Sequence, residues 1–183
     1  MGVIKDVVAS WEKKCNNIPA LFNLYARPYK GIVKKELQLA GIDESDYVLN
    51  IGCGAMPFTA VYIAKLSGAK VCAIDYDQQA VNRARNCIKK LGLAGQIEVK
   101  VGDGTSYSAE DFTAGLVALQ AEPKGEILAN LLATANQGNR FVFRRARKMF
   151  SQQYDFLPER YKPEATVRQW MLTFNRSALF VKN

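Results

Sequence analysis

The chain has 183 residues, of which 49% are hydrophobic and 23% charged, which is the ordinary composition of a single globular domain. Its four cysteines lack C-x-x-C spacing and it has no histidine, which argues against a zinc site and excludes His-dependent nucleophilic catalysis, so no metal is expected. The net charge of +8 favours an anionic partner. With no bilayer-length apolar run and no signal-peptide core, we expect a cytoplasmic protein without a membrane.

The N-terminal segment is predicted to be helical. Apolar residues recur at helical spacings over residues 4–40, and Pro19 and Pro28 mark helix starts or breaks. We expect residues 1–40 to form a helical cap on a core of residues 41–183, within one domain. Two interpretations stay open for Tyr25, Arg27 and Tyr29: they line a pocket, or they only pack the segment on the domain.

A glycine-rich turn follows the first predicted strand, residues 47–51, and precedes a helix predicted over residues 57–66. The sequence across this junction is Asn50-Ile51-Gly52-Cys53-Gly54-Ala55-Met56-Pro57. Glycines at such a turn let backbone N–H groups and the helix N-terminus approach a bound cofactor. The junction therefore indicates a nucleotide-binding site.

The next strand, residues 70–74, ends in Asp75, where a carboxylate can accept the hydroxyls of a ribose. Nicotinamide, flavin and S-adenosylmethionine (SAM) enzymes all use this arrangement. Pro57 occupies the place of the third glycine of the dinucleotide fingerprint, which disfavours a pyrophosphate and favours SAM over a nicotinamide. Tyr76 follows, and it either stacks on the adenine or is an ordinary half-buried tyrosine.

The rest of the chain alternates between predicted helices and strands. Such alternation predicts a Rossmann-like, doubly wound α/β fold with a mostly parallel seven-stranded sheet. A closing antiparallel hairpin is predicted from two strands joined by a tight turn at Asn175-Arg176. After Asp75 the expected elements are helix 78–91, strand 97–101, strand 115–120, helix 123–135, strand 140–144, helix 145–152, strand 167–174 and strand 177–181.

Three segments and the hairpin resemble the class I SAM-dependent methyltransferase superfamily. The segments are Val48 to Gly54, Ala73 to Asp77 and Val101 to Gly104. The resemblance implies contact of the adenine with Asp103, although an Asp-Gly pair also simply forms turns. Asn50 stands where the superfamily usually has an acid that contacts the methionine amino group. The implied cofactor-binding residues are Asn50, Gly52, Cys53, Gly54, Pro57, Thr59, Asp75, Tyr76, Asp103, Gly104, Leu119 and Gln120.

A narrower resemblance is to nicotianamine synthases, which share the fold but transfer the aminocarboxypropyl group of SAM. Their glycine turn is similar to Gly52-x-Gly54-x-x-Pro57-x-Thr59, and the end of the fifth strand at Arg144 is also similar. Those enzymes carry a substantial helical N-terminal domain, whereas this chain has about forty residues there.

The candidate catalytic residues are Tyr25, Glu122 and Arg144. Glu122, just before Pro123, either acts as a base toward an amine or only favours the dipole of the following helix. Tyr25 is the alternative base. Arg144 belongs to the densest basic cluster of the sequence, and it either holds a substrate carboxylate or phosphate or lies on a solvated helix face.

These residues predict a SAM-dependent methyltransferase that acts on a small molecule by direct in-line transfer, and the net charge of +8 favours an anionic acceptor. Two alternatives stay open: aminocarboxypropyl transfer from SAM, and a non-catalytic SAM-binding module, which Asn50 leaves room for. Leu119-Gln120-Ala121-Glu122 stands where amino-group nucleic-acid methyltransferases carry Asn-Pro-Pro-Tyr, so nucleic acid is expected to be an unlikely partner. The sequence does not indicate an oligomeric state.

Overall fold

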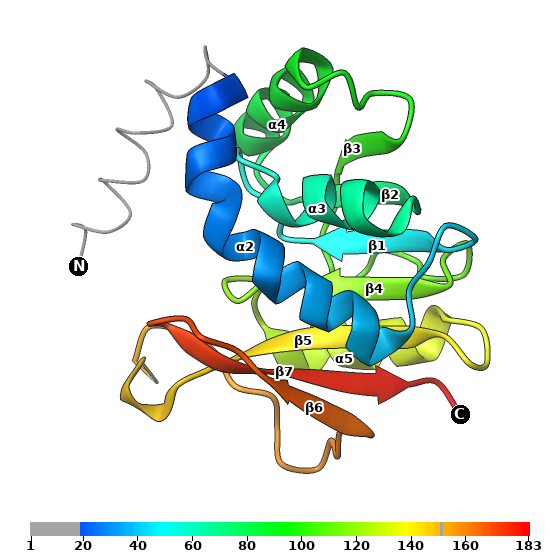
Figure 1. Ribbon diagram of the computed structural model, residues 1–183. Helices are drawn as coiled ribbons and strands as arrows, with labels where there is room; N and C mark the ends of the chain where they lie inside the picture. The colour runs from blue at the N-terminus through cyan, green and yellow to red at the C-terminus, as the bar shows by residue number, and fades with distance from the viewer. Residues whose placement is uncertain (1–18, 151) are drawn as a thin grey trace.

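The computed structural model describes residues 19–150 and 152–183, with side chains from residue 27 onward. Figure 1 shows one mixed sheet with helices packed against it. The elements in chain order are α2 (Pro19–Ala40), β1 (Tyr47–Ile51), α3 (Phe58–Ser67), β2 (Lys70–Asp75), α4 (Gln78–Lys90), β3 (Ile97–Val101), β4 (Ala114–Val117), α5 (Lys124–Thr134), β5 (Arg140–Ala146), the 3-10 helix η1 (Lys148–Phe150), β6 (Ala165–Arg168) and β7 (Phe174–Val181).

The sheet has seven strands in the order β3-β2-β1-β4-β5-β7-β6. Strands β1 to β5 run parallel, while β7 pairs antiparallel with both β5 and β6. The order reverses at β1, where the chain crosses from β3 to β4, and open α/β sheets bind ligands at such a reversal. The predicted Rossmann-like fold with a closing antiparallel hairpin is confirmed.

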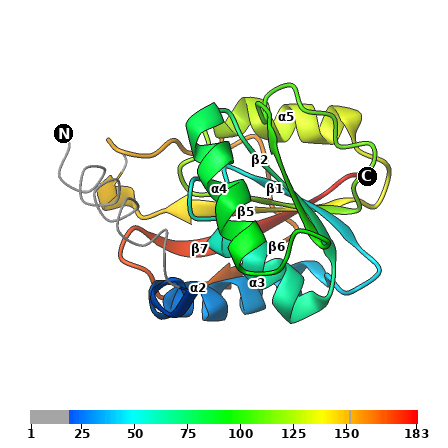
Figure 2. The ribbon, with the colours of Figure 1, turned by 90° about the horizontal axis from the view of Figure 1, so that it is seen from above.

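Two apolar cores lie on opposite faces of the sheet. Alternate residues of β1 face opposite sides, as strand geometry requires: Val48 packs in a core with α2, α3 and α4, and Leu49 packs in a core with α5. Figure 2, seen from above, shows α5 on the other side of the sheet from α2 and α3. The central strands are covered on both faces, which explains their nearly continuous apolar sequences.

The predicted helix over residues 145–152 is wrong. Strand β5 continues to Ala146, because Arg145 and Ala146 pair with Arg176 and Phe174 of β7, and only the short η1 follows. The predicted turn at Asn175-Arg176 is also wrong, since both residues lie inside β7. Local propensity favoured a turn there, but pairing with β5 on one side and β6 on the other makes β7 a central strand of this part of the sheet.

Helix α2 continues through Pro28, which the sequence analysis had marked as a possible break. Its C-terminal half buries Ile32, Val33, Glu36 and Leu37 against the sheet. This tertiary packing offsets the backbone hydrogen bond that proline removes. The part of the predicted helical segment before Pro19 lies outside the described residues.

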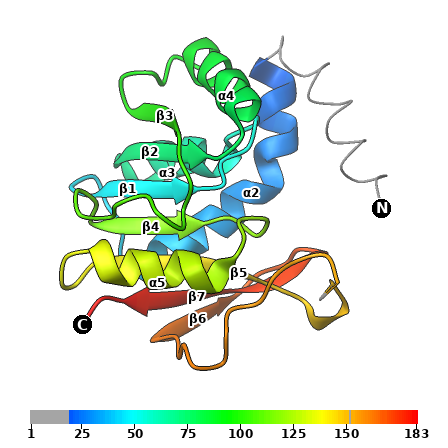
Figure 3. The same cartoon turned by 180° about the vertical axis from the view of Figure 1, so that it is seen from behind.

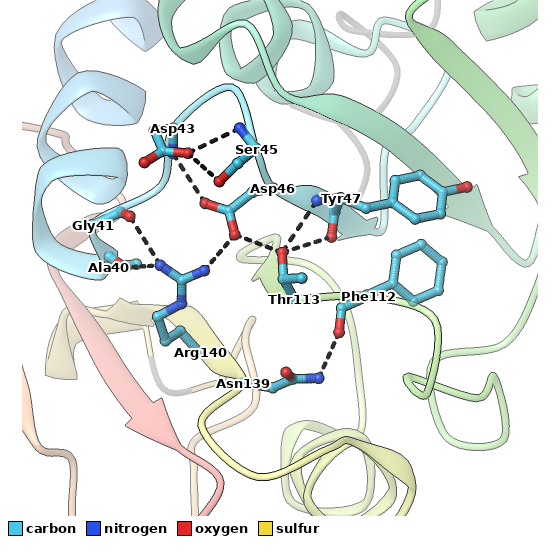
Figure 4. A network of polar contacts seen from close by, with 10 residues as sticks. All are labelled: Ala40, Gly41, Asp43, Ser45, Asp46, Tyr47, Phe112, Thr113, Asn139 and Arg140. Atoms are coloured by element: carbon cyan, nitrogen blue, oxygen red, sulfur yellow. Dashed lines mark hydrogen bonds and ion pairs between the residues drawn. The ribbon is translucent and has the colours of Figure 1, made fainter.

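A polar network ties together the ends of the strands that lie away from the glycine turn (Figure 4). Asp46, just before β1, accepts hydrogen bonds from Arg140 of β5 and from Thr113, just before β4. Arg140 also donates to the carbonyls of Ala40 and Gly41 at the end of α2, at 3.0 and 2.8 Å. The network fixes the end of α2 and the starts of β1, β4 and β5 relative to one another. These strand starts lie at the edge of the sheet opposite the glycine turn.

The described residues contain neither a membrane-spanning helix nor a cluster of metal-ligating side chains. None of the helices there is both long and apolar enough to cross a membrane. No group of three or more cysteine, aspartate or glutamate side chains in that part of the chain is placed to hold a metal ion.

Candidate functional site

A cavity of about 300 Å³ opens at the carboxyl ends of the parallel strands. It lies where the helices that follow the neighbouring strands β1 and β4 pack on opposite faces of the sheet, the position at which this class of sheet binds its ligands. Four separate loops contribute to its wall, those that follow β1, β2, β3 and β4. The lining residues are Ile51, Gly52, Asp75, Tyr76, Gly102, Asp103, Gly104, Gln120, Ala121, Glu122 and Ile127.

The glycine turn is held tightly against its neighbours. The N–H groups of Gly52 and Cys53 both donate to the Ile74 carbonyl of β2, at 2.9 and 3.0 Å. Gly52 has a φ of +76°, and a Cβ there would lie 3.2 Å from the Cβ of Ala121. A side chain at Gly52 would therefore be strained and would press on the far wall of the cavity.

Asp75 lies at the centre of the site, and its carboxylate is fixed by backbone groups. Oδ2 accepts a hydrogen bond from the Gly54 N–H at 2.8 Å, and Oδ1 accepts one from the Asp77 N–H at 3.1 Å. The residue is buried, yet it lines the cavity. A carboxylate has about four acceptor positions, so Asp75 keeps acceptor capacity for a ligand while its orientation is already set.

Tyr76 and Asp103 stand at the mouth of the cavity. The Tyr76 side chain is 83% exposed, so its ring is available to cover a flat ligand. Oδ1 of Asp103 accepts hydrogen bonds from the N–H and Oγ1 of Thr105, at 2.9 and 2.8 Å, and these bonds hold the pKa of Asp103 below its usual value. Asp103 therefore forms the predicted turn with one oxygen and also lines the cavity, while its contact with an adenine stays a prediction.

The loop after β4 is braced by a lysine that the sequence analysis did not single out. Lys124 is buried, and its Nζ donates to the carbonyls of Leu119 and Ala121, at 2.6 and 3.1 Å. Burial lowers the pKa of this ammonium group. The sequence does not mark this lysine as buried, because its burial depends on how the loop after β4 folds over the first turn of α5.

Of the two catalytic candidates whose side chains are described, Glu122 lines the cavity and Arg144 does not. Its Oε1 accepts a hydrogen bond from the Asp155 N–H at 2.7 Å. Asp155 in turn accepts one from the Lys124 N–H through Oδ2, also at 2.7 Å. The exposed carboxylate of Glu122 is thus positioned by a segment that lies about thirty residues later in the chain.

Arg144 does not face the cavity. Its Nε and Nη2 donate to the two carboxylate oxygens of Glu36 in α2, at 2.9 and 2.8 Å, and both side chains are buried. Burial acts to lower the pKa of Arg144, but the facing Glu36 carboxylate outweighs it, so the pKa is raised. The guanidinium also lies 5.8 Å from the centre of the Tyr29 ring and 5.6 Å from that of Phe174. Arg144 therefore joins α2 to the sheet. The side chain of Tyr25, the third catalytic candidate, lies outside the described part of the chain.

Several other predicted cofactor residues lie behind the cavity wall rather than on it. Asn50 is fully buried, and its Nδ2 donates to the Leu116 carbonyl at 3.0 Å. Its Oδ1 is the buried side-chain acceptor without a partner among the described residues. The remaining residues in this position are Cys53, Pro57, Thr59 and Leu119, all buried, and Gly54, which reaches the site through its N–H to Asp75.

Comparisons with known proteins agree with this geometry. Residues 48–137 match the family model described as "Methyltransferase domain". The L-histidine 2-aminobutanoyltransferase of Pseudomonas aeruginosa is 31% identical over 100 residues, which cover 54% of this chain and 38% of the relative. The ribosomal protein L11 methyltransferase of Aliivibrio fischeri is 34% identical over 96 residues, 52% of this chain and 28% of that protein. The chain thus spans less than half the length of these curated relatives.

Solved structures show the same fold at low identity. The structure of MtNAS, a nicotianamine synthase, in complex with MTA and tNA has a TM-score of 0.81 at 21% identity, covering 94% of this chain and 68% of that one. An RNA methyltransferase from Salinibacter ruber in complex with S-adenosyl-L-homocysteine has a TM-score of 0.68 at 22% identity, covering 83% and 90%. Both resemblances expected from the sequence are supported. Residues 48–137 thus match a methyltransferase domain, and the chain has the fold of the class I SAM-dependent methyltransferases.

Proposed function

We propose that this protein is a SAM-dependent transferase that holds the cofactor in the cavity beside the glycine turn. The observation that carries the proposal is Asp75, a buried carboxylate at the cavity wall that is oriented by two backbone N–H groups and keeps free acceptor positions. A ribose diol needs such an acceptor. The carboxylate is already in place, so little ordering is needed on binding.

The other lining residues fit the remaining parts of SAM. Tyr76 and Asp103 lie at the mouth, where an aromatic face and an acceptor suit an adenine and its amino group. Asn50 is given no contact with SAM in this assignment, because the residue is fully buried behind the cavity wall. In this assignment the Gly52–Gly54 turn lets the backbone approach the ligand, and no pyrophosphate-binding third glycine is needed.

Bound SAM supplies a sulfonium whose attached carbons are open to displacement by a nucleophile. The chain's own contribution is mainly positioning, because in-line displacement requires the nucleophile within about 3–3.5 Å of the carbon. Glu122 lines the same cavity and is the available group to take a proton from an amine acceptor. Lys124 and Asp155 hold the backbone on either side of Glu122.

The acceptor that we propose is a small molecule, and the transferred group is a methyl. The size of the cavity and the methyltransferase domain model support this choice. The aminocarboxypropyl group is the second candidate, supported by the curated relatives named L-histidine 2-aminobutanoyltransferase and by the likeness to MtNAS.

Chromatography of the co-products separates these candidates. The protein is incubated with SAM and a panel of amines that includes L-histidine. S-adenosylhomocysteine indicates methyl transfer, and methylthioadenosine indicates aminocarboxypropyl transfer. Glu122→Gln is expected to lower the rate by about 100-fold or more, whereas Glu126→Gln, an exposed acid of α5 outside the cavity, should leave it unchanged. SAM binding without either co-product would leave only the non-catalytic module.

A further inference from the structure

Three arginines lie side by side across the last three strands of the sheet. Arg145 of β5 is the register partner of Arg176 in β7, and Arg176 is the register partner of Arg168 in β6. Directly opposite residues on neighbouring strands have their Cβ atoms about 4.5–5.5 Å apart, and like charges in such pairs are destabilising. The three residues, named here the arginine row, therefore repel one another in the free protein.

The arginine row lies on the face of the sheet away from α2. The chain neighbour of each arginine points toward α2: Arg144 and Ser177 bond Glu36, and Gln169 bonds the Ile32 carbonyl. Successive side chains of a strand face opposite sides, so the arginines face the side on which α5 packs. Figure 3 shows this face, with α5 in front of β5 and with β7 and β6 below the helix.

No carboxylate neutralises the row within the described part of the chain. Among the described residues, ion pairs such as Lys100–Glu98, Arg140–Asp46 and Arg144–Glu36 involve none of these three arginines. Arg168 and Arg176 are exposed and Arg145 is half-buried. Three adjacent guanidinium groups without a counter-ion from the protein suit a ligand with several closely spaced negative charges.

An exposed aromatic residue stands next to the row. Trp170 lies two residues after Arg168, in the connection between β6 and β7, and it is 89% exposed. Leu172 in the same connection and Met149 after β5 are also exposed. An aromatic ring beside a basic track is the combination with which proteins bind single-stranded nucleic acids, by stacking a base and pairing the phosphates.

From these observations we propose that the arginine row and Trp170 form a binding surface for the phosphate backbone of a single-stranded RNA. The carboxyl end of β5, the start of β7 and the end of β6 all lie at the edge of the sheet that carries the cavity. The surface is distinct from the cofactor cavity, and the proposal holds whether or not the RNA itself carries the acceptor. It revises the expectation that nucleic acid is an unlikely partner.

Fluorescence anisotropy with a labelled single-stranded 12-nucleotide RNA tests the proposal on the full chain. Arg168→Gln/Arg176→Gln is expected to raise Kd by about tenfold or more at low salt, and to make the slope of log K against log[salt] shallower by about 1.4, or 0.7 per lost contact. The matched control is Lys65→Gln/Lys70→Gln, which removes the same charge from exposed positions near the opposite edge of the sheet. Equal loss in both double variants, or no binding by the wild type, would overturn the proposal.

The role of Trp170 has its own readout. Trp170→Ala is expected to raise Kd by about fivefold or more without changing the salt slope, while Trp170→Phe keeps most of the affinity because a ring remains. An unchanged Kd in Trp170→Ala, or competition by inorganic polyphosphate equal to that by unlabelled RNA, would contradict a nucleic-acid surface. S-adenosylhomocysteine affinity should be the same in all these variants, so a failure here is separate from a failure of the proposed function.

Discussion

Asp75 is oriented before any ligand arrives, since the glycine turn and the residue after Tyr76 each donate a backbone N–H to its carboxylate. The sequence could predict this residue because a carboxylate at the end of the second strand has a fixed geometric relation to the glycine turn. It could not predict Lys124 or the pairing of Arg144 with Glu36. Those depend on which segments fold over which, and no local pattern records that.

Cys53, inside the glycine turn, gives a prediction about pH. Burial, followed by the charge of Asp75, raises the pKa of its thiol from 9.0 to about 12 in the folded protein. Below pH 9 the thiol is protonated in both states, so the stability that it contributes is complete. Between pH 9 and 12 only the unfolded chain ionises, and the free energy of unfolding falls by about 1.4 kcal/mol per pH unit for this group.

Urea unfolding of the wild type and of Cys53→Ala at pH 8, 9.5 and 10.5 checks this. The variant should lose stability with rising pH less steeply than the wild type, whatever the other titrating groups contribute to both. Parallel losses would show that the Cys53 thiol ionises at the same pH in both states.

Helix α2 is attached to the sheet by a buried polar contact as well as by apolar packing. Glu36 accepts from Arg144 and also from Ser177 at 2.6 Å, and both partners lie on the central part of the β5–β7 ribbon. The strands and helices with strong periodicity were predicted close to their observed bounds. The end of β5 was assigned to a helix because its basic residues have good helix propensity, and only pairing with β7 reveals the strand.

A double-mutant cycle tests the contribution of the Glu36–Arg144 pair. Glu36→Leu or Arg144→Met alone should lower the free energy of unfolding by about 3–5 kcal/mol, because each leaves an unpaired buried charge. The double variant should recover most of that loss, since the site then becomes apolar. Glu98→Gln in the exposed pair with Lys100 is the control, with a cost of at most about 1 kcal/mol. Additive losses in the double variant would contradict the assignment.

At the scale of the whole molecule, the two ends of the parallel strands carry different features. One edge carries the Asp46–Arg140 network and fixes the strand starts (Figure 4), while the other carries the cavity and, beyond it, the arginine row. Part of the net charge of +8 is concentrated on one surface, because strand register places three arginines of the chain side by side. Composition alone could indicate an anionic partner, but only the antiparallel register of β5, β7 and β6 locates a surface for one.

The most direct test of the account is calorimetric titration of the protein with S-adenosylhomocysteine, repeated on Asp75→Ala and on Asp111→Ala, an exposed acid outside the cavity. We predict micromolar binding by the wild type and by Asp111→Ala, and a loss of about tenfold or more in Asp75→Ala, because two charge-assisted hydrogen bonds to the ribose are removed. No binding by the wild type, or the same affinity in a folded Asp75→Ala, would contradict the assignment of this cavity to the cofactor.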